Sequence, residues 1–264
     1  MRNGIMRRLG LAALLGVAVL LAACAERSIS DSGYAGGGRG YSGDRGNPFY
    51  KGELSEFDLL GIDVGRPASD EEIAQQLAEH RKISLSRGAT MMAIQSGAPM
   101  PDDQKVAALD RYFAVVPFSG VPPVRAEAAS YAANGVSPKL IDERITNYAR
   151  ALRLAAAKSG AEVIFCYWGV IDSAVEREAT KVVSWVPLVG SVIPDETQLM
   201  RIRLKVALID VRSGQWSMFA PEAFVDSALS AALIRAQSDQ KQVAALKEKA
   251  YKAAVEAFVA RYAS

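Results

Sequence analysis

The sequence predicts a single α/β domain in which helices pack on a mixed β-sheet, in the order β-α-β-α-β-β-β-α. The central observation is an apolar run over 161–171, whose lack of apolar–polar alternation indicates a strand covered on both faces. A helical repeat leads directly into this run, and a long strand with a tight turn comes later. The 264 residues suffice for one well-buried domain with flanking tails.

The first 23 residues have the parts of a secretory signal peptide, with a positive start at Arg7-Arg8 and an apolar run over 9–20. That run is too short to span a bilayer comfortably. The next segment, Leu21-Ala22-Ala23-Cys24, resembles the lipobox of bacterial lipoproteins. The resemblance implies cleavage before Cys24, a diacylglycerol on its sulfur and acylation of the new amino group. The alternative is an ordinary signal peptide with a chance cysteine.

The residue after the expected lipidated cysteine is Ala25 rather than an aspartate. In enterobacterial sorting the absence of Asp here implies export to the outer membrane, so we expect a lipid-anchored protein on its periplasmic face. Residues 24–52 are rich in Gly, Ser and Arg and have few apolar side chains, which predicts a flexible tether. A coil of this length spans roughly 30 Å root-mean-square. Its aromatic side chains could instead dock on a partner.

An N-terminal helical extension is expected over 53–87. Ser69 and Glu72 have the spacing of a capping box and predict the start of a short amphipathic helix. The positions on its apolar side are Ile73, Leu77 and His80. His80 is the only histidine of the chain, and we expect a packed, hydrogen-bonded side chain rather than a catalyst.

The domain proper is expected over 88–264 and opens with alternating strands and helices. The predicted elements are a strand over 89–96, a helix over 101–112, a strand over 113–118, a helix from Ser137-Pro138 to Gly160, and then the buried strand. The first of these helices presents Val106, Leu109 and Tyr112 to the core. The apolar stripe of the longer helix comprises Ile141, Ile145, Tyr148, Leu152 and Ala155.

A second long strand is predicted over 201–211, because alternate residues are apolar. Its apolar side comprises Ile202, Leu204, Val206 and Leu208, and its basic side comprises Arg201, Arg203 and Lys205. A tight turn containing Gly214, which should take φ > 0, leads into a strand over 215–219. In a final helix over 240–262, Lys247 interrupts the apolar stripe and should extend its amino group to solvent.

Two short motifs in this order resemble the CsgG/TolB amino-terminal-domain superfamily. There a helix leads into a Gly-Ala-Asp strand, and a later strand ends in an Asp-x-x-Thr-Gly turn. Here Gly160-Ala161-Glu162 and residues 210–214 hold those places, with Glu for Asp and Ser for Thr. The resemblance covers 88–262 and implies the fold. Members include the curli export pore, a polysaccharide export lipoprotein and activators of peptidoglycan synthases, which implies assembly or contact in the envelope rather than chemistry.

The composition argues against nucleic-acid binding and against most catalytic chemistry. Removing the signal with its three arginines lowers the formal charge from +2 to −1, so the basic isoelectric point reflects a cleaved segment. One histidine makes Ser-His-Asp and Cys-His arrangements hard to build, and no metal-ligand spacing or phosphate-binding loop occurs. Cys166 lies in the buried strand, so we expect an inert thiol and no disulfide. We therefore expect no enzyme, cofactor or metal; a hydrolase with spatially paired carboxylates is the alternative.

An apolar segment over 182–194 lies between two strands that should be hairpin neighbours. A much shorter connection would suffice there, and exposed apolar patches tend to mark contact with a partner or a membrane. The sequence therefore predicts a partner-binding loop formed by Trp185, Pro187, Leu188, Val192 and Ile193. The alternative is that the two strands extend and that these residues pack on the domain itself.

Together these features predict an outer-membrane lipoprotein anchored through Cys24. Its periplasmic domain should be a non-catalytic binding or accessory subunit in cell-envelope assembly or export. We expect another envelope protein as its partner and no nucleic acid, and we leave self-association into a homo-oligomer open. The first alternative is an oligomeric export-pore subunit of the curli-secretion type. The second is an unrecognised periplasmic enzyme.

Overall fold

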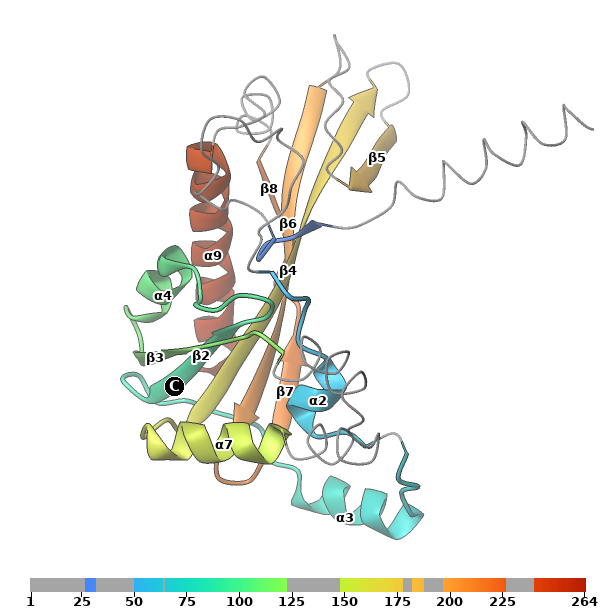
Figure 1. Cartoon of the computed structure of the whole chain (residues 1–264), viewed down its shortest axis with the longest axis vertical. Helices are drawn as coiled ribbons and strands as arrows, with labels where there is room; N and C mark the ends of the chain where they lie inside the picture. Colours follow the sequence, from blue (N-terminus) through green and yellow to red (C-terminus); the bar gives the residue numbers. More distant parts are fainter. Residues whose placement is uncertain are drawn as a thin grey trace, which may run out of the picture.

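The structure is a computed structural model that describes residues 27–31, 50–63, 65–122, 148–177, 182–187, 197–226 and 240–264. Its strands are β1 (Arg27–Ser28), β2 (Thr90–Gln95), β3 (Ala114–Phe118), β4 (Val163–Arg177), β5 (Val182–Pro187), β6 (Thr197–Asp210), β7 (Trp216–Phe219) and β8 (Phe224–Asp226). They form one eight-stranded mixed sheet along the path β3-β2-β4-β6-β7, with β1 and β5 on β4 and β8 on β6. The predicted α/β class is confirmed (Figure 1).

β4 is the centre of the sheet, as its apolar sequence predicts. Residues 163–168 are all buried, and Phe165, Cys166 and Tyr167 have no exposed surface. β2 runs parallel to β4, and β6 runs antiparallel to it over 163–176. Because strands lie on both edges of β4 and helices cover both of its faces here, this strand joins the two halves of the core.

Among the described elements, two helices cover each face of the sheet. The helices are α2 (Glu56–Leu60), α3 (Asp70–Glu79), α4 (Asp103–Leu109), α7 (Tyr148–Lys158) and α9 (Gln240–Tyr262). On one face α4 and α9 contribute to a buried cluster in which the rings of Phe165 and Phe258 lie 5.0 Å apart. On the other face α2 and α7 contribute Leu59 and Leu152 to a second cluster. The helix predicted from Ser137 is described from Tyr148 onward, and 137–147 lies outside the described residues.

Three separate segments occupy the same edge of β4 in succession. β2 pairs with residues 163–167, β1 with Val170 and Ile171, and β5 with residues 172–177. Arg27 and Ser28 lie within the range 24–52 that the sequence predicts to be a flexible tether, and here they form a strand, whereas 24–26 and 32–49 lie outside the described residues. Composition alone suggested a coil, but the backbone groups of Arg27 and Ser28 complete the ladder on this edge of β4.

The strands around the predicted apolar loop are longer than the sequence suggested. β4 continues to Arg177 and β6 begins at Thr197, and the two remain in register as far as Glu176 opposite Thr197. The first part of the loop, β5, adds to the outer end of β4. The backbone therefore follows the alternative given above for the segment 182–194, in which the strands on either side of it extend. The extended strands pair the backbone N–H and C=O groups of β4 with those of β6.

The α3 helix forms as predicted but does not pack as predicted. Ser69 and Glu72 make the reciprocal bonds of a capping box. None of the residues of α3 is buried: Ile73 is 51% exposed and Leu77 is 74% exposed. These two side chains line a groove of about 580 Å³ against the turn before β7. His80 also lines this groove and is exposed, which corrects the prediction of a packed side chain. The helical spacing correctly predicted that one side of α3 is apolar. It could not show that this side packs against so little of the domain that none of its residues is buried.

Candidate functional site

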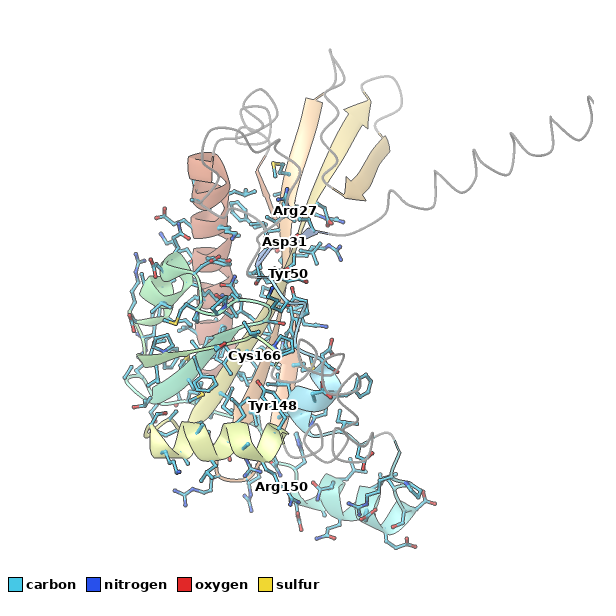
Figure 2. All side chains as sticks on the ribbon, viewed as in Figure 1. Arg27, Asp31, Tyr50, Tyr148, Arg150 and Cys166 are labelled. Carbon is cyan, nitrogen blue, oxygen red and sulfur yellow. The ribbon has the colours of Figure 1, made fainter. Side chains whose placement is uncertain are left out.

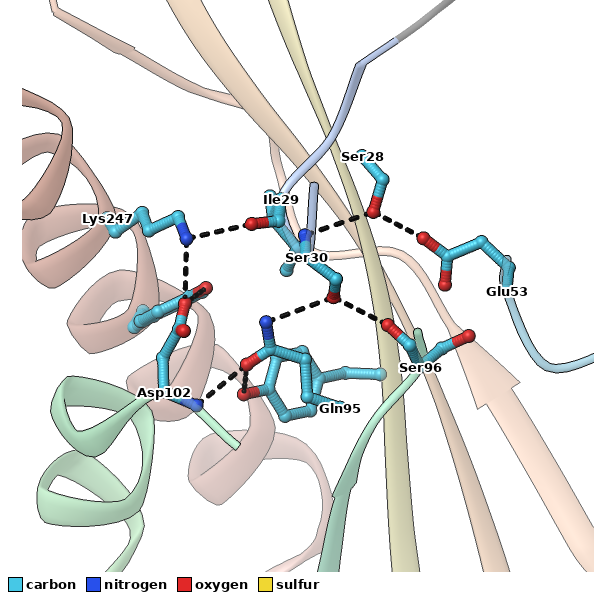
Figure 3. A network of polar contacts seen from close by, with 10 residues as sticks. Ser28, Ile29, Ser30, Glu53, Gln95, Ser96, Asp102 and Lys247 are labelled. Atoms are coloured by element: carbon cyan, nitrogen blue, oxygen red, sulfur yellow. Dashed lines mark hydrogen bonds and ion pairs between the residues drawn. The ribbon is translucent and has the colours of Figure 1, made fainter. Parts of the chain in front are cut away.

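The most elaborate polar arrangement among the described residues surrounds the short segment 27–31. We call this segment and the groups that hold it the N-terminal docking site. The groups that hold the segment are Glu53, Gln95, Ser96, Asp102, Gly169 and Lys247. Figure 3 shows all of them except Gly169 around Ser28, Ile29 and Ser30. The segment begins only three residues after Cys24, so this site lies next to the expected lipid anchor.

The backbone of the segment continues the sheet. Arg27 pairs with Ile171 and Ser28 with Val170, and the Ile29 N–H donates to the carbonyl oxygen of Gly169 at 3.0 Å. The Ile29 side chain is 1% exposed. A Cβ atom on Gly169 would lie 2.8 Å from Cδ1 of Ile29 and 2.7 Å from a methyl carbon of Leu204, so a glycine at this position makes room for the isoleucine.

The hydroxyl groups of the serines on either side of Ile29 form hydrogen bonds with the rest of the domain. The Ser30 hydroxyl donates to the carbonyl oxygen of Ser96 at 2.6 Å and accepts from the amide of Gln95 at 3.0 Å. The Ser28 hydroxyl donates to the Glu53 carboxylate. Burial acts to raise the pKa of Glu53, and it outweighs the hydrogen bonds that act in the opposite direction. The segment is thus fixed by its backbone, by one apolar side chain and by two hydroxyls.

Lys247 connects the segment to the C-terminal helix. Its Nζ donates to the carbonyl oxygen of Ile29 at 2.8 Å and to a carboxylate oxygen of Asp102 at 2.9 Å. The Tyr251 hydroxyl donates to the same Asp102 oxygen at 2.5 Å. Lys247 is 6% exposed, which corrects the prediction that its amino group reaches solvent. The ammonium group tolerates burial because a carboxylate and a carbonyl oxygen accept from it.

A second buried lysine lies beside this network and was missed by sequence reasoning. Lys105 on α4 has no exposed surface, and its Nζ has no hydrogen-bond partner. It lies 5.1 Å from the ring centroid of Tyr167 and 5.3 Å from that of Tyr251. Burial lowers its pKa to about 7. The helical spacing of Lys105 with Leu109 and Tyr112 was a signal for this position, but a lysine is normally assigned to solvent.

Beyond the docking site, charged side chains gather on one face of the outer sheet. Arg201 and Arg203 on β6 donate to the Asp172 carboxylate at 2.9 Å and 2.7 Å. Burial acts to raise the pKa of Asp172, but the hydrogen bonds from Arg203 and Arg201 outweigh it and hold the pKa below its usual value. The predicted basic side of β6 therefore lies next to a buried carboxylate of β4, which binds two of its guanidinium groups.

The predicted site residues are only partly described. Trp185 and Pro187 lie on β5, opposite Ala174 and Asp172 in register. Cys24, Leu188, Val192 and Ile193 lie outside the described residues. The partner-binding surface therefore stays a prediction. Cys166 is buried as expected, and burial raises the pKa of its thiol well above its usual value.

Comparison with known proteins identifies one family. The family model described as YafT bacterial lipoprotein matches residues 55–261. The matched range contains most of the groups that hold the docking segment, from Gln95 to Lys247, and excludes the segment itself. No curated protein and no solved structure matches the chain, so the resemblance to the CsgG/TolB superfamily stays a prediction.

Proposed function

Because the chain belongs to the YafT bacterial lipoprotein family, we propose that it is an outer-membrane lipoprotein anchored through acyl chains on Cys24. In this proposal its periplasmic domain is a non-catalytic binding or accessory subunit in cell-envelope assembly or export. Membership of a lipoprotein family makes the chain a membrane-anchored envelope protein. The choice of membrane, the acylated residue and the binding role are parts of the proposal.

The observation that carries the proposal is the N-terminal docking site. Three residues after Cys24 the chain enters the sheet, so the backbone that joins the anchor to the domain can span at most about 10 Å. Burial of Ile29 contributes roughly 1.5–3 kcal/mol to holding the segment. The charged hydrogen bond from Lys247 adds roughly 1.5–3 kcal/mol. An anchor fastened in this way positions the domain at the membrane, which suits a protein that acts by contact there.

The placement of the perturbed ionisable groups also supports binding rather than catalysis. The described groups with the largest pKa shifts include Lys105, Tyr167 and Tyr251, all of which burial shifts away from their charged forms. They are enclosed in the core, where a substrate does not reach them. A catalytic group instead has to touch its substrate.

Labelling of the anchor tests the proposal. Cys24→Ala should abolish incorporation of a fatty-acid analogue and release the protein from the membrane fraction, because the thiol that accepts the diacylglycerol is gone. Cys166→Ala is the matched control and should be labelled like the wild type, since that thiol is buried. Wild-type labelling of the Cys24 variant would refute the anchor. Density-gradient separation of the two membranes then tests the outer-membrane assignment.

The oligomeric export-pore subunit remains the second candidate, because β4 and β6 form a long antiparallel pair of 15 and 14 residues. Light scattering and electron microscopy of the full-length protein in detergent separate the two candidates. An accessory subunit should be a monomer or a small oligomer, whereas ring-shaped assemblies would favour the pore.

A further inference from the structure

The docking site limits which surface of the domain can approach the bilayer. If Cys24 carries the acyl chains, as proposed above, the residues from Cys24 to Arg27 span at most about 10 Å. The position of β1 is fixed by its pairing with β4 and by the groups around Ile29. The part of the domain around β1 is therefore held within a short distance of the headgroups, and the opposite end is held away from them.

The sheet register identifies the residues at this end. Val170, which pairs with Ser28, lies seven residues into β4 from its start at Val163, roughly 23 Å along the strand. Arg203 is the β6 partner of Val170, two strand spacings or about 10 Å from β1. Figure 2 shows Arg27 and Asp31 about halfway along the long strands, with the outer parts of β4 and β6 continuing beyond them, whereas Arg150 on α7 lies near the other end.

In the cluster formed by Asp172, Arg201 and Arg203, the cations are more exposed than the anion. Residues opposite one another in register share a face of the sheet, so Arg203 lies on the same face as Ser28, and Arg201 and Asp172 follow it. The Asp172 side chain is 5% exposed, whereas those of Arg203 and Arg201 are 42% and 21% exposed. A membrane that approaches this surface meets guanidinium groups before it meets the carboxylate.

Guanidinium groups suit phospholipid headgroups. A planar guanidinium group can donate two parallel N–H···O hydrogen bonds to the oxygens of one phosphate, and it stays charged at any physiological pH. An anionic leaflet also attracts basic side chains within a Debye length of its surface. We propose that the end of the domain formed by β1 and the outer halves of β4 and β6 is its membrane-facing surface, with Arg203 and Arg201 contacting phospholipid phosphates of the leaflet that holds the acyl chains.

Two exposed apolar positions allow a direct test of orientation. Val225 on β8 pairs with Arg201 and is 47% exposed, whereas Leu154 on α7 is 57% exposed at the other end. Each is changed to cysteine and labelled with a fluorophore in the acylated full-length protein, reconstituted in phosphatidylethanolamine and phosphatidylglycerol vesicles. Cys166 is buried and should not react. A headgroup nitroxide lipid should quench the label at 225 strongly and the label at 154 weakly; equal or reversed quenching would overturn the proposal.

A second arm tests the arginine contact. Arg203→Gln in the Val225→Cys background should shift the ratio of membrane-facing to rotated orientations by about fivefold, the effect of one charge at an anionic surface. Arg212→Gln removes one charge from the exposed turn at the far end of β6 and should leave quenching unchanged. Arg203→Lys should restore most of the effect. Quenching that responds equally to both glutamine variants, or to neither, would remove the arginine from the contact.

The two proposals fail in different ways. If the protein does not float with the vesicles and takes up no fatty-acid analogue, the anchor on Cys24 is wrong and the membrane-facing surface falls with it. If the protein is acylated and floats but the label at 154 is quenched more, the anchor stands and only the orientation is refuted.

Discussion

At the scale of single residues, Lys105 is the least expected feature of the core. Its ammonium group would face three aromatic rings, those of Phe165, Tyr167 and Tyr251, at 5.1–5.4 Å. Cation–π attraction favours the charged form, but no hydrogen bond replaces the lost hydration. The lowering of its pKa to about 7 shows that desolvation wins.

This shift predicts a pH dependence of stability. Between pH 7 and the ordinary lysine value of 10.5, the unfolded chain holds a proton that the folded chain has lost. Stability therefore rises with pH in this window, with a slope of up to about 1.4 kcal/mol per pH unit from this group. Urea unfolding at pH 7, 7.5 and 8 measures it. The range stops below the pH at which Cys166, Tyr167 and Tyr251 act in the opposite direction, because burial raises the pKa of each of these groups.

Lys105→Met should remove this contribution, because the thioether fills similar space without a charge, and it should stabilise the domain at pH 7. Lys158→Met is the matched control on the exposed end of α7 and should keep the wild-type slope. An unchanged slope in Lys105→Met would show that its amine is not the group that titrates.

Gly169→Ala tests the space made for Ile29. The added methyl would meet Ile29 and Leu204 below 3 Å, so we expect a loss of roughly 1–3 kcal/mol from overpacking and faster hydrogen exchange of the Ile29 amide. Combining it with Ile29→Ala should cost less than the sum of the two single changes. Strict additivity of the unfolding free energies would contradict the contact.

At the scale of elements, β5 carries the remaining prediction about partners. Trp185→Ala with Leu188→Ala should leave the unfolding free energy within about 0.5 kcal/mol of the wild type, as for exposed substitutions. It should also abolish crosslinks to the envelope protein captured in cells. Trp216→Ala is the control, because this tryptophan is 43% exposed on β7 and lies outside the predicted loop. A loss of about 2–5 kcal/mol per substitution would instead place Trp185 and Leu188 in the core.

At the scale of the whole molecule, the docking site sets how far the domain stands from its anchor. Ile29→Asp would bury an unpaired charge, so we expect residues 27–31 to leave the sheet. The chain from Cys24 to Tyr50 would then act as a coil, and the reach of the domain would grow from about 10 Å to roughly 30 Å. Energy transfer from the label at 225 to a membrane dye measures this change.

Phe57→Asp is the control for that experiment, because Phe57 is 53% exposed on α2 and its replacement adds the same charge without burying it. Trypsin supplies an independent measurement: cleavage after Arg27 should be slow in the wild type and fast in Ile29→Asp. Equal cleavage rates in the two proteins would mean that the segment does not hold the domain.

The sequence by itself determined the features that depend on neighbouring residues. The apolar run of β4, the capping box of α3 and the turn at Gly214 follow from residues within a few positions of each other, and all three form as predicted. Gly214 takes a φ of 77° because the chain must reverse between β6 and β7, and its N–H donates to the Asp210 carbonyl oxygen. The lipobox is also local, which is why the sequence alone indicated a lipoprotein.

Only the tertiary structure decided what packs against these elements. It left α3 exposed, buried Lys105, turned Lys247 inward and built residues 27–31 into the sheet. The decisive bonds join distant positions: the Ser30 hydroxyl and the Ser96 carbonyl are 66 residues apart, and Lys247 and Ile29 are 218 apart. No local pattern specifies such partners, because a polar group is stable in the core only when a complementary group from elsewhere in the chain satisfies it.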